Sequence, residues 1–208
     1  MSIGAKVRSL CGPLETPVTD LYRAFFVDLN SQTRQIQAWA PQAANILEIG
    51  CGEGAIAQHL AALYPSARIT GIDITPKAGR LFRGDRSRVN FHQATAAEWA
   101  AAHVNDYDLV LTCDVLHHVP WDQHEQLLMD ARSLLKSGGS FVLKDWELIK
   151  NLGHTLCEFS DRVLTGDDVR FGSADYFSGL LGGVFGTVPH RAHIRPWRNN
   201  IMFHVVKA

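Results

Sequence analysis

One carboxylate stands in an apolar run directly ahead of a glycine-rich segment. Residues 46–54 read Ile-Leu-Glu-Ile-Gly-Cys-Gly-Glu-Gly, and Glu48 lies two residues before Gly50. Glycines let a ligand approach the backbone closely because no Cβ blocks it, and the start of a following helix offers free N–H groups. A carboxylate at Glu48 attracts an ammonium-bearing or cationic group and repels a pyrophosphate. The segment therefore predicts a site for a ligand that is positively charged at one end.

A second acid, Asp73, ends the next apolar run and offers two acceptor oxygens, which suit the hydroxyls of a ribose. A dinucleotide is the alternative ligand, because Gly50-x-Gly52-x-x-Ala55 satisfies the loose dinucleotide pattern and Asp73 follows at the expected distance. Glu48 argues against it. So does the lack of a Tyr-x-x-x-Lys pair, since the tyrosines at 22, 64, 107 and 176 are followed four residues later by Phe26, Arg68, Leu111 and Leu180.

Short apolar runs alternate with helical patterns from Asn45 onward, which is typical of strand–helix units in a parallel sheet. The runs flanking residues 198–200 predict an antiparallel hairpin. We therefore expect an α/β fold: a Rossmann-like three-layer sandwich with a seven-stranded, mostly parallel sheet, an antiparallel C-terminal hairpin and N-terminal helices. The predicted strands are 46–49, 68–72, 89–92, 108–112, 140–143, 188–194 and 201–206.

Helices are predicted from apolar spacing and from their end signals. Two short helices are expected between Val18 and Ala40, with a break near Asn30-Ser31. Asp122-Gln-His-Glu125 resembles a capping box for a helix that the glycine pair 138–139 closes. Further helices are predicted after Gly54 and at 96–103, 152–164 and 173–181, the last ended by the glycine pair 182–183.

The ordered motifs resemble the seven-stranded (class I) S-adenosylmethionine-dependent methyltransferases over roughly Asn45 to Lys207. The matching pieces are residues 46–54, Gly71-Ile-Asp-Ile74, Tyr107-Asp-Leu-Val-Leu-Thr-Cys-Asp-Val-Leu-His-His-Val119 and Leu134-Leu-Lys-Ser-Gly-Gly-Ser-Phe-Val142. The resemblance implies S-adenosyl-L-methionine as cofactor and S-adenosyl-L-homocysteine as product.

Cofactor contacts are implied residue by residue. Glu48 would meet the methionyl ammonium, and Asp73 the ribose, with Ile74 against the adenine. Members of the family commonly carry an acid after the third strand for the adenine amino group, whereas this chain has Gln93-Ala-Thr-Ala96. The Thr95 hydroxyl or the Ala96 backbone is left for that contact. The backbone of Gly50, Cys51 and Gly52 would pass under the cofactor, and the pocket would be completed by Cys113, Asp114 and His118.

Methyl transfer from a sulfonium needs mainly alignment, and a general base only where the acceptor must lose a proton. His117 and His118 are the candidate bases because imidazole titrates near neutral pH. The alternative is that one histidine shapes the cofactor pocket or bonds to backbone. No metal is expected, since adjacent histidines on a helix diverge by about 100° and Asp167-Asp168 resembles a turn.

The acceptor is expected to contact parts outside the common core, namely the N-terminal helices and residues 146–177. Asp145 and Trp146 end the fifth strand and are predicted substrate contacts. Aromatic side chains in this region could cover an apolar small molecule or could simply be core packing. Tyr22 and Arg23 could reach the cofactor carboxylate if the first helix folds over the site.

The chain has 208 residues, a formal net charge of −1 and a pI near 6.8, so it lacks the basic field that binds nucleic acid. The first residues lack the apolar core of a signal peptide, no apolar stretch approaches a membrane span, and the four cysteines are widely separated. We expect a cytoplasmic, single-domain protein without a membrane partner. Its predicted parts are an N-terminal helical cap (1–40), a cofactor-binding core (45–146), a substrate-side helical insertion (147–187) and the hairpin (188–207).

The resulting hypothesis is a small-molecule methyltransferase that methylates an oxygen. One alternative is an RNA- or protein-modifying methyltransferase, but the Asn/Asp-Pro-Pro-Tyr/Phe signature for nitrogen methylation is missing where Cys113-Asp114-Val-Leu stands. Another alternative is a non-catalytic, cofactor-binding partner subunit.

Overall fold

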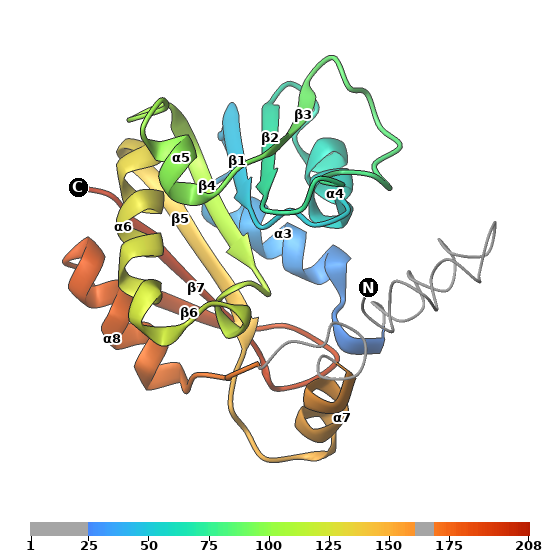
Figure 1. Cartoon of the computed structure of the whole chain (residues 1–208), viewed down its shortest axis with the longest axis vertical. Coiled ribbons are helices and arrows are strands. Elements are labelled where there is room, and N and C mark those ends of the chain that lie inside the picture. The colour runs from blue at the N-terminus through green and yellow to red at the C-terminus, as the bar shows by residue number, and fades with distance from the viewer. Residues whose placement is uncertain (1–24, 161–168) are drawn as a thin grey trace.

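A computed structural model describes residues 25–160 and 169–208. Seven strands form one sheet in the order β3-β2-β1-β4-β5-β7-β6 (Figure 1). The first five strands of that order are parallel, whereas β7 runs antiparallel to both β5 and β6. The α/β sandwich predicted from the sequence is therefore confirmed, including its C-terminal hairpin. The strands are β1 (Asn45–Ile49), β2 (Arg68–Asp73), β3 (Val89–Gln93), β4 (Tyr107–Cys113), β5 (Leu135–Trp146), β6 (His190–His193) and β7 (Asn200–Val206).

Helices cover both faces of the sheet because its central strands are apolar on both sides. One face packs on α3 (Leu29–Trp39) and α4 (Ala55–Leu63), and the other on α5 (Ala96–Ala100), α6 (His124–Leu134) and α8 (Ala174–Phe185) (Figure 1). Alternate residues of each strand enter the two cores: Ile46 of β1 joins the α3–α4 side and Leu47 the other. The remaining described helix, α7 (Leu152–Ser160), follows β5 beyond the carboxyl end of that strand.

The N-terminal helical region breaks at a different residue from the one predicted. Helix α3 runs unbroken through Asn30-Ser31, and the interruption lies at Val27–Asp28. The Asp28 carboxylate caps the helix by accepting a hydrogen bond from the Ser31 N–H at 3.0 Å. Val27 forms a β-bridge with Pro196, so this segment is fastened to the loop before β7. The earlier part of the expected helical pair, up to residue 24, lies outside the described residues.

The predicted capping box at Asp122 is wrong. Residues 121–123 form a short 3-10 turn, and α6 begins at His124 without a side-chain cap. A capping box does occur at α5, where Thr95 and Glu98 bond reciprocally. The glycines at 138 and 139 do not close α6 either, because the helix ends at Leu134 and Gly138, with a φ of 76°, lies within β5.

Helix α8 runs past the glycine pair that was predicted to end it and stops at Gly186, whose φ is 72°. The buried side chains of Phe177, Leu181 and Phe185 recur at four-residue spacing along it. Two interior glycines cost about 1 kcal/mol each, whereas burial of one large apolar side chain contributes about 1.5–3 kcal/mol. Packing of Phe185 on Phe141, with ring centroids 5.3 Å apart, therefore outweighs the weak helix propensity of the glycines.

Candidate active site at the carboxyl ends of the strands

The glycine segment forms the turn between β1 and α4, and its path is fixed by backbone hydrogen bonds. The N–H groups of Gly50 and Cys51 both donate to the Ile72 carbonyl, at 2.8 and 3.0 Å. Gly50 has a φ of 76°, and a Cβ at this position would lie 2.3 Å from the Val115 Cγ2 atom. Both observations require glycine at position 50.

Asp73 ties the loop to the end of β2. Its carboxylate accepts hydrogen bonds from the N–H of Gly52 at 2.7 Å and from the N–H of Thr75 at 2.8 Å. One bond reaches each oxygen, and each oxygen has a second lone pair with which to accept from a ligand hydroxyl. No atom of the described residues lies within 4 Å of a Cβ built on Gly52. The loop is therefore open on the side of Gly52.

Two groups expected near the adenine have different surroundings. Ile74 directly follows Asp73 and has 76% of its surface exposed, although it is a large apolar side chain. The Thr95 hydroxyl donates to the Glu98 carboxylate at 2.8 Å and accepts from the Glu98 N–H at 3.2 Å. The Thr95 hydroxyl is thus engaged in capping α5. Of the two groups predicted to contact the adenine amino group, this leaves the backbone of Ala96.

Glu48 is a carboxylate almost completely withdrawn from solvent, with 2% of its surface exposed. Its negative charge acts on two buried thiols. The pKa of Cys51 is raised by burial and then by the charges of Glu48 and Asp73, and the pKa of Cys113 by burial, Glu48 and Asp114. Both thiols therefore stay protonated near neutral pH. A cationic ligand group here would offset the negative potential that three carboxylates create.

His117 and Asp145 form a buried pair across the next two elements. The His117 Nδ1 and Asp145 Oδ1 atoms are 2.6 Å apart, and their side chains are 5% and 0% exposed. Burial raises the pKa of Asp145, but the charge and hydrogen bond of His117 and the Trp146 N–H outweigh it, so the pKa is lowered. Asp145 is therefore a carboxylate, and His117 donates its Nδ1 proton to it. When the ring is in its neutral form, this leaves the lone pair on Nε2.

Local backbone geometry presents this pair at the sheet edge. His117 lies in a 3-10 turn, η2 (Leu116–His118), just beyond β4, and its N–H donates to Asp145 Oδ2 at 3.3 Å. The Phe171 ring stacks on the imidazole with centroids 5.3 Å apart. The Arg170 N–H donates to the His117 carbonyl at 3.0 Å. These contacts fix the orientation of the imidazole ring. A general base needs such a fixed orientation.

A second ion pair crosses the same two strands. The fully buried Lys144 ammonium donates to Asp114 Oδ1 at 2.5 Å, and the Asp114 side chain is 38% exposed. Asp114 has a φ of 56°, the left-handed region that aspartate tolerates better than most residues. The ammonium therefore holds Asp114 in place beside the His117–Asp145 pair.

The other predicted site residues separate by exposure. His118 is exposed, and its ring lies 4.1 Å from the ring of His117. Asp145 and Trp146, predicted as direct substrate contacts, are 0% and 2% exposed. Asp145 reaches the site through His117. The predicted contacts of Tyr22 and Arg23 lie outside the described residues.

Asp114, His117 and Asp145 bring three ligand atoms within 4.8 Å of one another. A divalent ion would favour such a donor set. The Lys144 ammonium, however, already neutralises Asp114, and the imidazole proton already bonds to Asp145. The arrangement of these three residues therefore fits a salt-bridge network better than a metal site.

Sequence reasoning missed Lys144 as the partner of Asp114. It also missed Gln32 of α3, a buried amide near Cys113. The signal for Lys144 is a lysine inside an otherwise apolar strand, a place where an unpaired charge is costly. The signal for Gln32 is its position four residues before Ile36, on the buried face of its helix.

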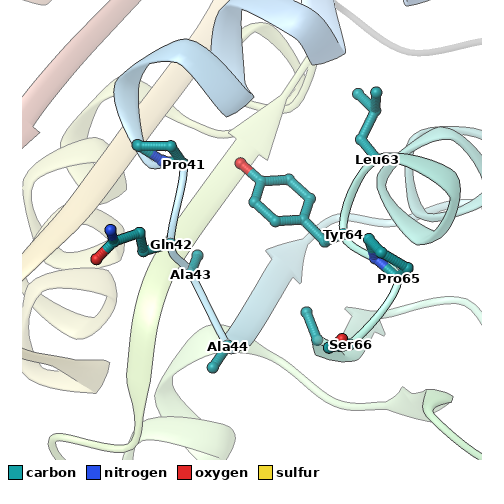
Figure 2. Close-up of a pocket in the computed structure, with 9 residues that line it drawn as sticks. Pro41, Gln42, Ala43, Ala44, Leu63, Tyr64, Pro65 and Ser66 are labelled. Carbon is teal, nitrogen blue, oxygen red and sulfur yellow. The ribbon is translucent and has the colours of Figure 1, made fainter.

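A shallow pocket lies at the opposite, amino-terminal edge of the sheet (Figure 2). It is lined by residues 41–44 and 63–67, none of which is charged. The Tyr64 hydroxyl beside it donates to the Ala40 carbonyl at 3.0 Å. The one titratable side chain that lines the pocket is thus engaged in a structural hydrogen bond, and burial raises the pKa of Tyr64 to about 12. Within the described ranges, no helix has both the length and the apolar composition that a membrane crossing needs.

The strand order and the acid–glycine loop define a class of protein, the seven-stranded methyltransferase fold. Residues 46–139 match the family model described as a methyltransferase domain. A crystal structure of a Burkholderia thailandensis 1,6-didemethyltoxoflavin-N1-methyltransferase, with bound 1,6-didemethyltoxoflavin and S-adenosylhomocysteine, superposes with a TM-score of 0.69. The two chains are 17% identical, and the superposition covers 100% of this chain and 91% of the Burkholderia thailandensis chain.

Two relatives with higher sequence identity share one name. The ubiquinone biosynthesis O-methyltransferase of Xanthomonas axonopodis pv. citri is 31% identical over 160 residues, which are 75% of this chain and 59% of that protein. The enzyme of the same name from Aromatoleum aromaticum is 38% identical over 79 residues, 36% of this chain and 33% of that protein. The chain thus spans less than two thirds of the length of these relatives. Over these matched stretches it is similar to the class I S-adenosylmethionine-dependent methyltransferases.

Proposed function

We propose that this chain binds S-adenosylmethionine and transfers its methyl group to an oxygen of a small-molecule acceptor. The observation that carries the proposal is the buried His117–Asp145 pair at the same sheet edge as the Glu48 loop. A loop of this kind holds the cofactor, and an oriented imidazole is what removal of a hydroxyl proton requires. The names of the sequence relatives support transfer to oxygen.

The residues of the loop fit this cofactor. Glu48 would bind the ammonium of the amino-acid end, Asp73 the ribose hydroxyls and Ile74 the adenine face. Gly52, with no described atom near its Cβ position, lets the ligand approach the backbone. The Ala96 backbone is the preferred adenine contact, because Glu98 already engages Thr95. The backbone of Gly50 and Cys51 shapes the loop, and Cys113, Asp114 and His118 complete the pocket.

When bound, S-adenosylmethionine supplies an electrophilic methyl group and leaves as S-adenosylhomocysteine. His117 accepts the proton of the acceptor hydroxyl at Nε2, and the oxygen keeps the electron pair that forms its new bond to the methyl carbon. Asp145 acts as a positioning residue: it holds the Nδ1 proton of His117 and stabilises the imidazolium that forms. Trp146 lies behind this pair and is buried, so we assign it to the wall of the acceptor site.

A small-molecule acceptor is preferred over RNA or protein. The formal charge of −1 gives no net positive field to attract a phosphate backbone. The segment after β4 that would carry an amide- or base-methylating signature holds Asp114 instead, which pairs with Lys144 of β5.

The test is transfer of a labelled methyl group from S-adenosylmethionine to a bacterial metabolite extract and, separately, to RNA. We expect label in small molecules only, and a His117→Ala variant that binds S-adenosylhomocysteine normally while turnover falls by roughly 10²–10⁴-fold. His190→Ala, on the exposed edge strand β6, is the matched control and should keep full turnover. Label in RNA would favour the modifying alternative. Cofactor binding without transfer to either pool would favour the partner-subunit alternative.

A further inference from the structure

Gln32 is a polar side chain buried without a hydrogen-bonding partner. It has 0% of its surface exposed, and neither its Nε2 nor its Oε1 atom has a partner in the described ranges. A buried primary amide can donate two hydrogen bonds and accept two. Such groups are rare in folded proteins and usually mark a site for a bound water, an ion or a ligand.

The amide lies at the sheet edge that carries the Glu48 loop. Gln32 and Ile36 share the buried face of α3, and Ile36 belongs to the same hydrophobic cluster as Cys113, which ends β4. Gln32 is close enough to Cys113 to lower the pKa of that thiol, although the overall shift is upward because burial and the Glu48 charge dominate. The two side chains are therefore in close contact, but the contact lacks the full distance and angle of a hydrogen bond. Gln32 and Glu48 therefore both border the Cys113 thiol, and the amide is not satisfied there.

We propose that Gln32 is a ligand-binding residue whose amide binds the amino-acid end of the cofactor beside Glu48. The inference rests on the proposed function. An α-amino acid presents an ammonium donor and a carboxylate acceptor side by side, which complement Oε1 and Nε2 of one amide. Glu48 supplies the negative charge for the ammonium. Gln32 adds an N–H donor for the cofactor carboxylate, which an ionised acidic side chain cannot provide.

Gln32 also gives α3 a part in binding. The residue lies outside positions 46–139 that the family model covers. Helix α3 is held in place by the Asp28 cap, by the Asp28 N–H bond to the Arg195 carbonyl at 2.9 Å and by packing on α4. A ligand that bonds to Gln32 therefore connects the cofactor loop with the N-terminal segment and with the loop before β7.

Two ligands that differ only at the amino-acid end test the proposal by titration calorimetry. S-Adenosylhomocysteine carries that end, and 5′-methylthioadenosine keeps the sulfur nucleoside without it. For Gln32→Leu we expect the Kd of S-adenosylhomocysteine to rise by roughly tenfold or more, and the Kd of 5′-methylthioadenosine to stay unchanged. Equal losses for both ligands, or no loss for S-adenosylhomocysteine, would overturn the inference. A wild-type chain that binds neither ligand would instead refute the proposed function.

Gln37→Leu is the matched control, because Gln37 lies on the same helix and its amide already donates to the Leu63 carbonyl at 2.8 Å. This variant should bind both ligands like the wild type. Ligand-free Gln32→Leu should melt no lower than the wild type, since an unsatisfied amide is exchanged for an apolar group of similar shape. If it fails to fold, Gln32→Asn keeps the amide and shortens its reach. For that variant, an unchanged S-adenosylhomocysteine affinity likewise overturns the proposal.

Discussion

The two halves of the candidate site are held in different ways. The loop half, residues 48–54 and 73–75, is shaped by backbone: two N–H groups converge on the Ile72 carbonyl, and Asp73 caps the N–H of Gly52. The dyad half consists of Asp114, His117, Lys144 and Asp145. It is shaped by two side-chain ion pairs between residues that are 30 and 28 positions apart in the sequence.

This difference separates what binds from what reacts. A turn built from backbone groups and glycines depends little on the identity of the other side chains. Such a turn therefore suits a ligand that is common to a whole family. Buried side-chain pairs depend on the identity and protonation of each partner. We infer that the loop half recognises the shared cofactor and that the dyad half is tuned to one acceptor. Variants in each half should therefore fail in different ways.

The largest effect is expected in the loop half, from Gly50→Ala. An alanine at a φ of 76° is strained by about 1–3 kcal/mol, and its Cβ would meet Val115 at 2.3 Å, which adds about 1–3 kcal/mol of overpacking. We expect the free energy of unfolding to fall by about 3 kcal/mol or more and S-adenosylhomocysteine binding to be lost. Urea denaturation and calorimetry measure the two quantities.

Gly52→Ala is the matched control for that variant. Gly52 also has a positive φ, 49°, but an added Cβ meets no described atom. Its stability cost should therefore be only about 1–2 kcal/mol, with ligand affinity reduced because the Cβ projects into the open side of the loop. Equal destabilisation by the two alanines would contradict the steric account of position 50.

An asymmetric effect, no larger than that of Gly50→Ala, is expected in the dyad half when the Asp114–Lys144 pair is broken from either side. Asp114→Asn leaves a fully buried ammonium without its partner, which costs about 3 kcal/mol. Asparagine tolerates the φ of 56°, so the loss reports charge and not backbone strain. Lys144→Met leaves a carboxylate that is 38% exposed and stays solvated, so its cost should be under about 1 kcal/mol.

Chemical denaturation of both variants and of the double variant checks this expectation. The double variant should resemble Lys144→Met, because removal of the ammonium also removes the penalty of leaving it unpaired. If the two single variants were equally unstable, the buried lysine would not be the member of the pair that needs its partner.

The sequence predicts the loop half well and the dyad half poorly, for one physical reason. Glu48, Gly50 and Asp73 stand next to apolar runs whose strands place them at one sheet edge, and the structure brings them together there. Local patterns fix that half. Asp145, by contrast, is predicted at the site only as a substrate contact. Its pairing with His117, and that of Lys144 with Asp114, become visible only when β5 pairs with β4.

The secondary-structure errors have the same origin. The acid–x–x–acid pattern at Asp122 satisfies a local rule, yet the structure begins α6 at His124, whose ring lies buried against the η2 turn. The same rule went unnoticed at Thr95, where the cap forms. Tertiary burial of His124 decides the first case, and only the three-dimensional contacts disclose it.

The smallest effect is expected in the pH dependence of the free energy of unfolding. It is measured by comparing the wild type with Asp145→Asn, which replaces the buried carboxylate by a neutral amide. The folded-state pKa of Asp145 lies below its ordinary value because the charge and hydrogen bond of His117, the Trp146 N–H and the Lys144 charge outweigh burial. A lowered pKa means that the unfolded chain binds the proton more readily, so this contribution is complete above the unfolded pKa of about 3.9. It is lost as the pH falls through the folded value.

Urea unfolding at pH 6, 4 and 3 should therefore show that acid lowers the free energy of unfolding less for Asp145→Asn than for the wild type. Other carboxylates with lowered pKa values, such as that of Asp108, remain in both proteins and cancel in the difference. Parallel curves would mean that the His117–Asp145 pair does not depend on the charge of the carboxylate.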